Sequence, residues 1–116
     1  MDTWTERLEH LATEDIGAGL TLHVASRLRA RRKGLAKMDA MPPDHALHIM
    51  RCNSIHTIGM RFALDLVWLA KDGRVVRVDE DVAPRKFKLC TGARTVIETR
   101  AGAGRRFAEA WFVRAA

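Results

Sequence analysis

The sequence predicts an α+β fold that is rich in strands, on three observations. Residues 64–69 form an apolar run that ends before an Asp72-Gly73 turn, and valines return at 75, 76 and 78, as in a β-hairpin. Apolar and polar residues alternate over 20–24, as in a strand with one buried face. The 116 residues, 47% hydrophobic and 29% charged, are enough for one domain with its own core.

The first half of the chain combines weak helical signals with a strand. Apolar residues near helical spacing predict a weak helix within residues 1–16. Gly17 and Gly19 end it, and the strand at 20–24 follows. A second helix is expected over 26–38, with Ser26 as its N-cap and Gly34 weakening its interior. Residues 41–44 form a loop.

The second half is dominated by strands. Residues 45–52 fit a strand by their apolar alternation and a helix by the spacing of their histidines, and the polar residues 53–59 predict a loop. Pro84 ends or bends the returning strand of the hairpin, because proline has no N–H to donate to the ladder. Residues 96–99 are expected to form another strand, residues 101–110 a short helix, and residues 111–113 a final strand.

Composition also bears on location. No run approaches the roughly 18 apolar residues that a membrane-spanning helix needs. The first twenty residues are interrupted by acidic side chains and contain no continuous apolar segment, unlike a secretory signal. We therefore expect a cytoplasmic protein without membrane contact, in which Cys52 and Cys90 stay reduced.

The formal net charge is +6, and much of the excess lies in one basic segment, defined here as Arg27–Lys33. Such a segment attracts phosphate without sequence specificity, so non-specific nucleic-acid binding is one hypothesis. No aromatic residue is interleaved with the basic side chains for base stacking. A solvated helix face is the simpler interpretation.

A family resemblance is carried by four motifs. The sequence CNSIHTIGMRFALD at 52–65 is followed by VWL at 67–69, DGRVV at 72–76 and CTGA at 90–93, and an Arg-rich segment that ends in Gly34-Leu35 lies upstream. Together they resemble the domain of unknown function 192 family, also called uncharacterised protein family 0127. The resemblance covers residues 20–107. It implies one small barrel-like β domain over 20–116 with one or two short helices packed on it, a weakly helical N-terminal extension at 1–19, and no known activity.

Asp65 is the most informative single residue, because it lies between Leu64 and Leu66 in an apolar run where a bare carboxylate is costly to bury. It must face solvent or accept hydrogen bonds. We expect it to hold the polar loop 53–61 to the domain, and that loop is the best site candidate because rigid scaffolds present binding residues on loops. The candidate ligand-binding residues are Asn53, Ser54, His56, Thr57, Arg61 and Asp65.

Cysteine and histidine offer an alternative chemistry. Cys52, His56 and Cys90 could contribute to a metal site, although no C-x-x-C pair is present and a buried thiol packs as a small hydrophobe. A Cys52–Cys90 disulfide formed in vitro is another possibility. Cys52, His56 and Asp65 have the residue types of a nucleophilic triad, but spacing alone does not show geometry.

Three functions are therefore weighed. The first is a small binding or accessory module that presents the 53–61 loop to a small polar ligand or a protein partner, with no cofactor and no catalysis. The second is a metal or thiol enzyme site, and the third is a nucleic-acid binder that uses the basic segment.

Overall fold

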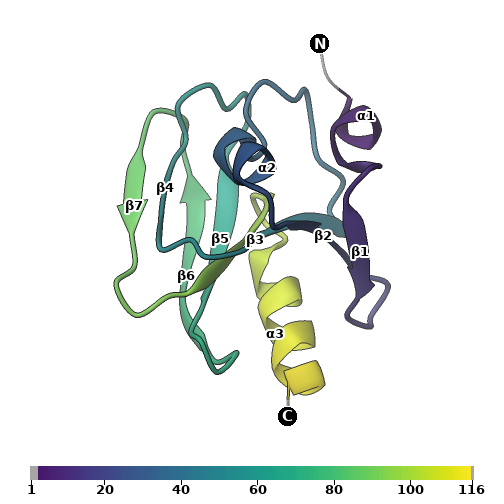
Figure 1. Ribbon diagram of the computed structural model, residues 1–116, viewed down its shortest axis with the longest axis vertical. Coiled ribbons are helices and arrows are strands. Elements are labelled where there is room, and N and C mark those ends of the chain that lie inside the picture. Colours follow the sequence, from purple (N-terminus) through teal and green to yellow (C-terminus); the bar gives the residue numbers. More distant parts are fainter. Residues whose placement is uncertain (1–2, 116) are drawn as a thin grey trace.

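The computed structural model describes residues 3–115, apart from the side chains of Leu28, Arg29 and Arg32. Its centre is a six-stranded sheet in the order β1-β2-β3-β8-β5-β6 (Figure 1). These strands are β1 Ala12–Asp15, β2 Thr21–Ala25, β3 His45–Ile49, β5 Leu64–Leu69, β6 Val75–Val82 and β8 Thr95–Arg100. Neighbours are antiparallel except for β2 and β3. A separate antiparallel pair joins β4 Ser54–His56 to β7 Phe87–Leu89. The predicted strand-rich α+β fold is confirmed, although the sheet does not close into a barrel.

Both faces of the sheet are covered, which explains the continuous apolar run at its centre. Helix α3, Gly104–Ala115, packs on one face, where Phe107 and Val67 lie in one apolar cluster. Helix α2, Leu28–Lys33, covers the opposite face with the chain that follows it, and Leu66 and Trp68 lie in the cluster on that side. Figure 1 shows the two helices on opposite sides of the sheet. Every residue of β5 is buried because successive side chains enter different clusters.

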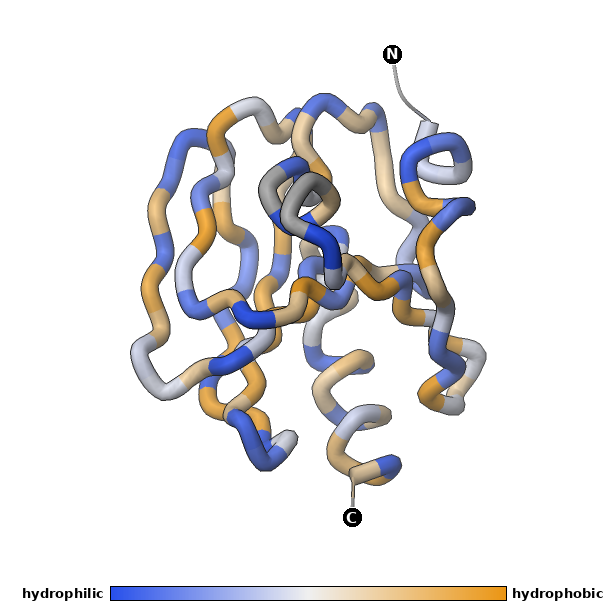
Figure 2. Tube along the Cα trace, in the orientation of Figure 1, coloured by the Kyte–Doolittle hydropathy of each residue, from blue (hydrophilic) through white to orange (hydrophobic). Residues whose placement is uncertain are grey.

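The hydropathy of the chain follows this arrangement. Hydrophobic residues lie along the central strands, whereas the tip of the β5–β6 hairpin is hydrophilic (Figure 2). At that tip the Asp72 carboxylate accepts a hydrogen bond from the Arg74 N–H, and Gly73 adopts a positive φ of 90°, so the predicted turn is confirmed. No helix among residues 3–115 is long and apolar enough to span a membrane.

Three expected elements differ from the structure. The helix expected within 1–16 occupies only α1, Trp4–Leu8, and residues 12–15 form β1 because the edge of β2 pairs with them. Helix α2 is shorter than expected: its N-cap is Arg27, not Ser26, and Gly34 ends it. Residues 111–113 are helical, not a strand, because Phe107 and Trp111 are one helical turn apart and both pack on the sheet. The ambiguous segment at 45–49 is a strand.

Candidate functional site

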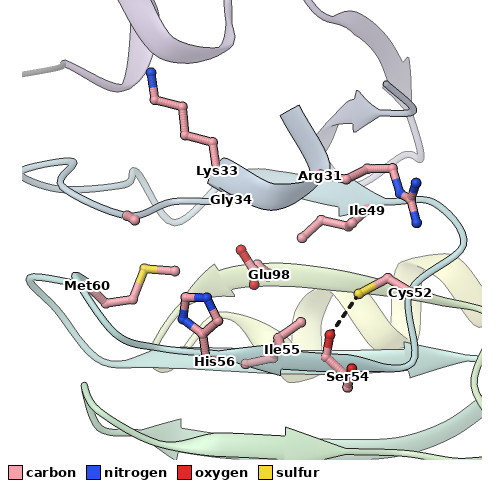
Figure 3. A pocket seen from close by; sticks show the side chains of 11 residues that line it. Arg31, Lys33, Gly34, Ile49, Cys52, Ser54, Ile55, His56, Met60 and Glu98 are labelled. Atoms are coloured by element: carbon pink, nitrogen blue, oxygen red, sulfur yellow. Dashed lines mark hydrogen bonds between the residues drawn. The ribbon is translucent and has the colours of Figure 1, made fainter. Parts of the chain in front are cut away.

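A pocket of about 490 Å³ lies between the chain around the end of α2 and strand β4 (Figure 3). This volume is typical of small-molecule sites. Its apolar lining consists of Gly34, Ala36, Ile49, Ile55 and Met60. Its polar and charged lining consists of Arg31, Lys33, Cys52, Ser54, His56 and Glu98. A larger hollow of about 740 Å³ lies beside α1, but its described lining residues include no carboxylate or thiol.

The floor of the pocket is formed by Glu98, in the middle of strand β8. Leu47 of β3 and Leu66 of β5 flank it in the sheet, and its residue exposure is only 2%. Figure 3 shows the carboxyl group pointing into the pocket. The Leu35 backbone N–H favours the charged form of this carboxyl group, but Oε1 accepts no hydrogen bond from the described residues. Burial raises the pKa of Glu98 to about 7, against the lowering effect of the Leu35 N–H.

The roof over Glu98 requires a glycine. Gly34 has a positive φ of 51°, and a Cβ atom there would lie 3.2 Å from Glu98 Oε1. The buried Arg7 of α1 holds the roof from above, since Nη1 donates to the Gly34 carbonyl at 3.1 Å and Nη2 to the Ala36 carbonyl at 2.7 Å. The Lys37 N–H donates to the Gly59 carbonyl at 2.8 Å and so joins the roof to the 53–61 loop. The pocket is therefore preformed by backbone contacts.

Cys52 and His56 approach the pocket from its walls. The Cys52 thiol donates to the Ser54 carbonyl at 3.2 Å, and Figure 3 shows this contact beside Glu98. Burial raises the pKa of the Cys52 thiol, the Glu98 charge adds to the effect, and the Ser54 hydrogen bond and Arg31 oppose it. A thiol of raised pKa is a poor nucleophile at neutral pH. The arrangement therefore favours binding over thiol catalysis.

The six candidate ligand-binding residues, five in the 53–61 loop and Asp65 beyond it, do not gather at one place. Ser54 and His56 line the pocket. Asn53 borders a different, smaller hollow near Arg94. The Arg61 side chain forms an ion pair with Asp39 at 3.0 Å. The loop itself contains β4, so it is more regular than the expected turn.

Thr57 is fully buried and has a structural role. Its hydroxyl donates to the Ala83 carbonyl at 2.8 Å and accepts from the Lys86 N–H at 2.8 Å. Its backbone N–H also donates to the Lys86 carbonyl. These bonds fix the loop to the chain before β7, which is the holding role that the sequence assigned to Asp65.

Asp65 lies on the other face of the sheet and holds helix α3. Its Oδ1 accepts from the Asp81 N–H at 2.8 Å, and its Oδ2 accepts from the N–H groups of Gly102 and Gly104, both at 2.9 Å. The prediction that Asp65 holds the 53–61 loop is therefore wrong. The expectation that a buried carboxylate must accept hydrogen bonds is confirmed, with residue exposure of 1%. The position of Asp65 also rules out a triad with Cys52, because the two side chains lie on opposite sides of the sheet.

The positions of the cysteines and histidines give little support to the metal and disulfide hypotheses. Cys52 is half-buried at the pocket, Cys90 is buried in the core, and both are free thiols. Among residues 3–115, no group of three or more His, Cys, Asp or Glu side chains lies close enough to hold a metal ion.

The basic segment is only partly described. Arg29 and Arg32 have side chains outside the described part of the structure. Arg31 donates to the carbonyls of Met50 and Arg51, at 2.7 and 2.6 Å, and so joins α2 to the end of β3.

Glu98 is the site residue that the sequence interpretation missed. A signal was present: Val96 and Glu98 occupy alternate positions of a strand whose neighbours are apolar, so both point to the same buried face. A carboxylate at an inward position of a predicted central strand marks either a structural or a functional site.

Comparisons with known proteins agree with the fold. The model of the family described as "Uncharacterized ACR", domain of unknown function 192, matches residues 10–108. No curated protein matches the chain. A crystal structure from Sinorhizobium meliloti 1021, described as a "putative transcription regulator", is 24% identical with a TM-score of 0.68, and the match covers 76% of this chain and 74% of that one. A protein of unknown function from Novosphingobium aromaticivorans DSM 12444 is 17% identical with a TM-score of 0.68, over 78% and 72% of the two chains. Both show likeness of fold alone.

Proposed function

The chain belongs to the domain of unknown function 192 family, and we propose that it is a binding module that takes a small polar ligand in the pocket above Glu98. The observation that carries this proposal is that Glu98 Oε1, at the floor of a preformed cavity, has no hydrogen-bond partner among the described residues. A buried polar atom without a partner costs free energy, so a fold retains one where a ligand or water completes it.

The lining supports a binding role in two further ways. The wall combines apolar side chains with polar groups, and a buried carboxyl group lies at the floor, a combination that small-molecule sites use for affinity and orientation. The Arg7 side chain holds the roof and a backbone hydrogen bond joins the roof to the 53–61 loop, so little ordering is needed when a ligand binds. Ser54 and His56 then serve as the part of the 53–61 loop that meets the ligand. The two free thiols support a reducing compartment such as the cytoplasm.

A fragment screen followed by amide chemical shifts tests the proposal. We expect hits to shift the amides of residues 52–56 and 98 together. Ser54→Trp places a large ring at the pocket wall and should abolish these shifts. Thr13→Trp is the matched control, because Thr13 is also an exposed strand residue but lies on β1, at the edge of the sheet. Hits that scatter over the surface, or that survive Ser54→Trp, would show that the pocket is not the binding site.

A further inference from the structure

The chemistry of the pocket narrows the class of ligand. The inference rests on the binding role proposed above. From the geometry we infer that the pocket takes a small amphiphilic cation, whose ammonium head group donates to the Glu98 carboxylate and whose short apolar body lies along Ile49, Ile55 and Met60.

The first step is the acceptor at the floor. Glu98 Oε1 is the buried side-chain oxygen that accepts no hydrogen bond within the described residues, and Glu98 itself is almost completely buried. A carboxylate in such a place is stabilised by a donor that carries positive charge, because a charge-assisted hydrogen bond is stronger than a neutral one. An anionic ligand would instead face a second buried negative charge.

The second step concerns the positive charges already present. Arg31 donates to two backbone carbonyls at the end of β3. Figure 3 shows the Lys33 ammonium group pointing away from Glu98. Neither side chain is among the causes of the shifted pKa of Glu98, which are burial and the Leu35 N–H. No positive side chain in the described part of the pocket lining pairs with Glu98, so the ligand supplies the counter-charge.

The third step is the remainder of the head group. An ammonium group has three N–H donors, and the Glu98 carboxylate accepts one. Cys52, Ser54 and His56 line the same pocket, and their polar atoms include acceptors for the others. Ile49, Ile55 and Met60 offer no polar side-chain atom except the weakly accepting thioether, so the body of the ligand is apolar.

Three probes that share a butyl chain distinguish the ligand classes: n-butylammonium, 1-butanol and pentanoate, each added to wild-type protein while the amide shifts of residues 52–56 and 98 are recorded. We expect n-butylammonium to bind with a dissociation constant in the millimolar range at pH 8, 1-butanol more weakly and pentanoate most weakly. Tighter binding of pentanoate or 1-butanol would overturn the inference and leave the binding role intact. No pocket shift with any probe would overturn both.

The dependence of binding on pH gives a second readout. Since the pKa of Glu98 is about 7, the ionised fraction rises from about a tenth at pH 6 to about nine tenths at pH 8, so n-butylammonium should bind about tenfold more tightly at pH 8. His56, Arg31 and Lys33 also line the pocket, so a variant is needed to assign the pH dependence to Glu98. The Cys52 thiol, of raised pKa, stays neutral.

Glu98→Gln separates Glu98 from His56. The glutamine keeps the shape but loses the charge, so n-butylammonium affinity at pH 8 should fall at least tenfold and the residual pH dependence should be small. Glu109→Gln is the control, because Glu109 is exposed on α3. This substitution should change neither the affinity for n-butylammonium nor its dependence on pH. An unchanged affinity, or an unchanged pH dependence, in Glu98→Gln would overturn the assignment of Glu98 as the group that binds the cation. The wild-type series tests the ligand class even without this variant.

Discussion

Replacing Asp65 with asparagine is the sharpest test of how this fold is held together. The Asp65 carboxylate accepts hydrogen bonds from three backbone N–H groups, of Asp81, Gly102 and Gly104. The first belongs to an irregular position of β6, where Asp81 has a positive φ of 54°. The Gly102 N–H lies in the turn before α3 and the Gly104 N–H in its first residue, where a negative charge also interacts favourably with the helix dipole. One side chain therefore joins β5, β6 and α3.

The expected cost of Asp65→Asn follows from these contacts. Asparagine keeps one acceptor oxygen but turns its NH₂ group toward N–H donors at the other position, which leaves at least one buried donor unpartnered. An unsatisfied donor costs about 1–3 kcal/mol and loss of charge assistance adds to it, so we expect a loss of about 3 kcal/mol in the free energy of unfolding. For a domain of this size, 1 kcal/mol corresponds to about 4 °C, so the melting temperature should fall by about 12 °C.

Thermal and urea unfolding followed by circular dichroism measure this change. Asp72→Asn is the matched control, because the Asp72 carboxylate accepts from Arg74 N–H at the exposed hairpin tip, and a surface change of this kind stays within about 0.5 kcal/mol. A melting temperature of Asp65→Asn within about 2 °C of wild type would refute the reasoning, since it would mean that the three bonds contribute no net stability.

Three further predictions concern close packing and pH. Gly104→Ala should lower stability by about 2 kcal/mol or more, because the new Cβ would lie 2.6 Å from Asp65 Cβ, whereas Gly92→Ala, with 3.6 Å to its nearest atom, should be nearly neutral in the same urea titration. Burial, with Arg114 adding to it, lowers the pKa of His48 to about 4. The stability that comes from the neutral form of His48 is complete above about pH 6.5 and is lost as the pH falls toward 4. Over that range the free energy of unfolding of wild type should fall by about 3 kcal/mol relative to His48→Gln. The folded pKa of Glu98, about 7, lies above the ordinary 4.5; its stability contribution is complete below pH 4.5 and is lost as the pH rises through 7. Between pH 5 and pH 8 wild type should therefore lose about 2.5 kcal/mol relative to Glu98→Gln, and parallel curves for the two proteins would contradict the burial of this carboxyl group.

The elements that the sequence predicted well are those in which a local pattern and the tertiary contacts agree. The β5–β6 hairpin has an apolar run, a turn that suits Asp-Gly, and returning valines, and the structure places it as expected. Where several patterns compete, tertiary contacts decide. Trp111 and Phe112 favour a strand by propensity, yet Trp111 belongs to α3, where its indole N–H donates to the Gly73 carbonyl at 2.7 Å.

Prediction of the candidate site was less complete, because a pocket is formed by residues far apart in sequence. The 53–61 loop supplied Ser54 and His56, but the roof comes from Gly34 and the floor from Glu98. No local pattern connects these positions. Their proximity depends on the sheet order, in which β8 lies between β3 and β5, and a strand order of this kind does not follow from the separate strands.

Asp65 and Glu98 together show how burial of a carboxylate separates structure from function. Both lie in central strands and both are nearly inaccessible to solvent. Asp65 accepts three backbone hydrogen bonds, which compensate for its desolvation, whereas Glu98 Oε1 accepts none within the described residues. Neutralising the first should therefore destabilise the fold, and neutralising the second should stabilise it at pH 8. A group that lowers stability, has a perturbed pKa and faces a cavity is a candidate for function, because the fold gains nothing else from it. Opposite signs of the two stability changes would therefore support a structural role for Asp65 and a ligand-binding role for Glu98.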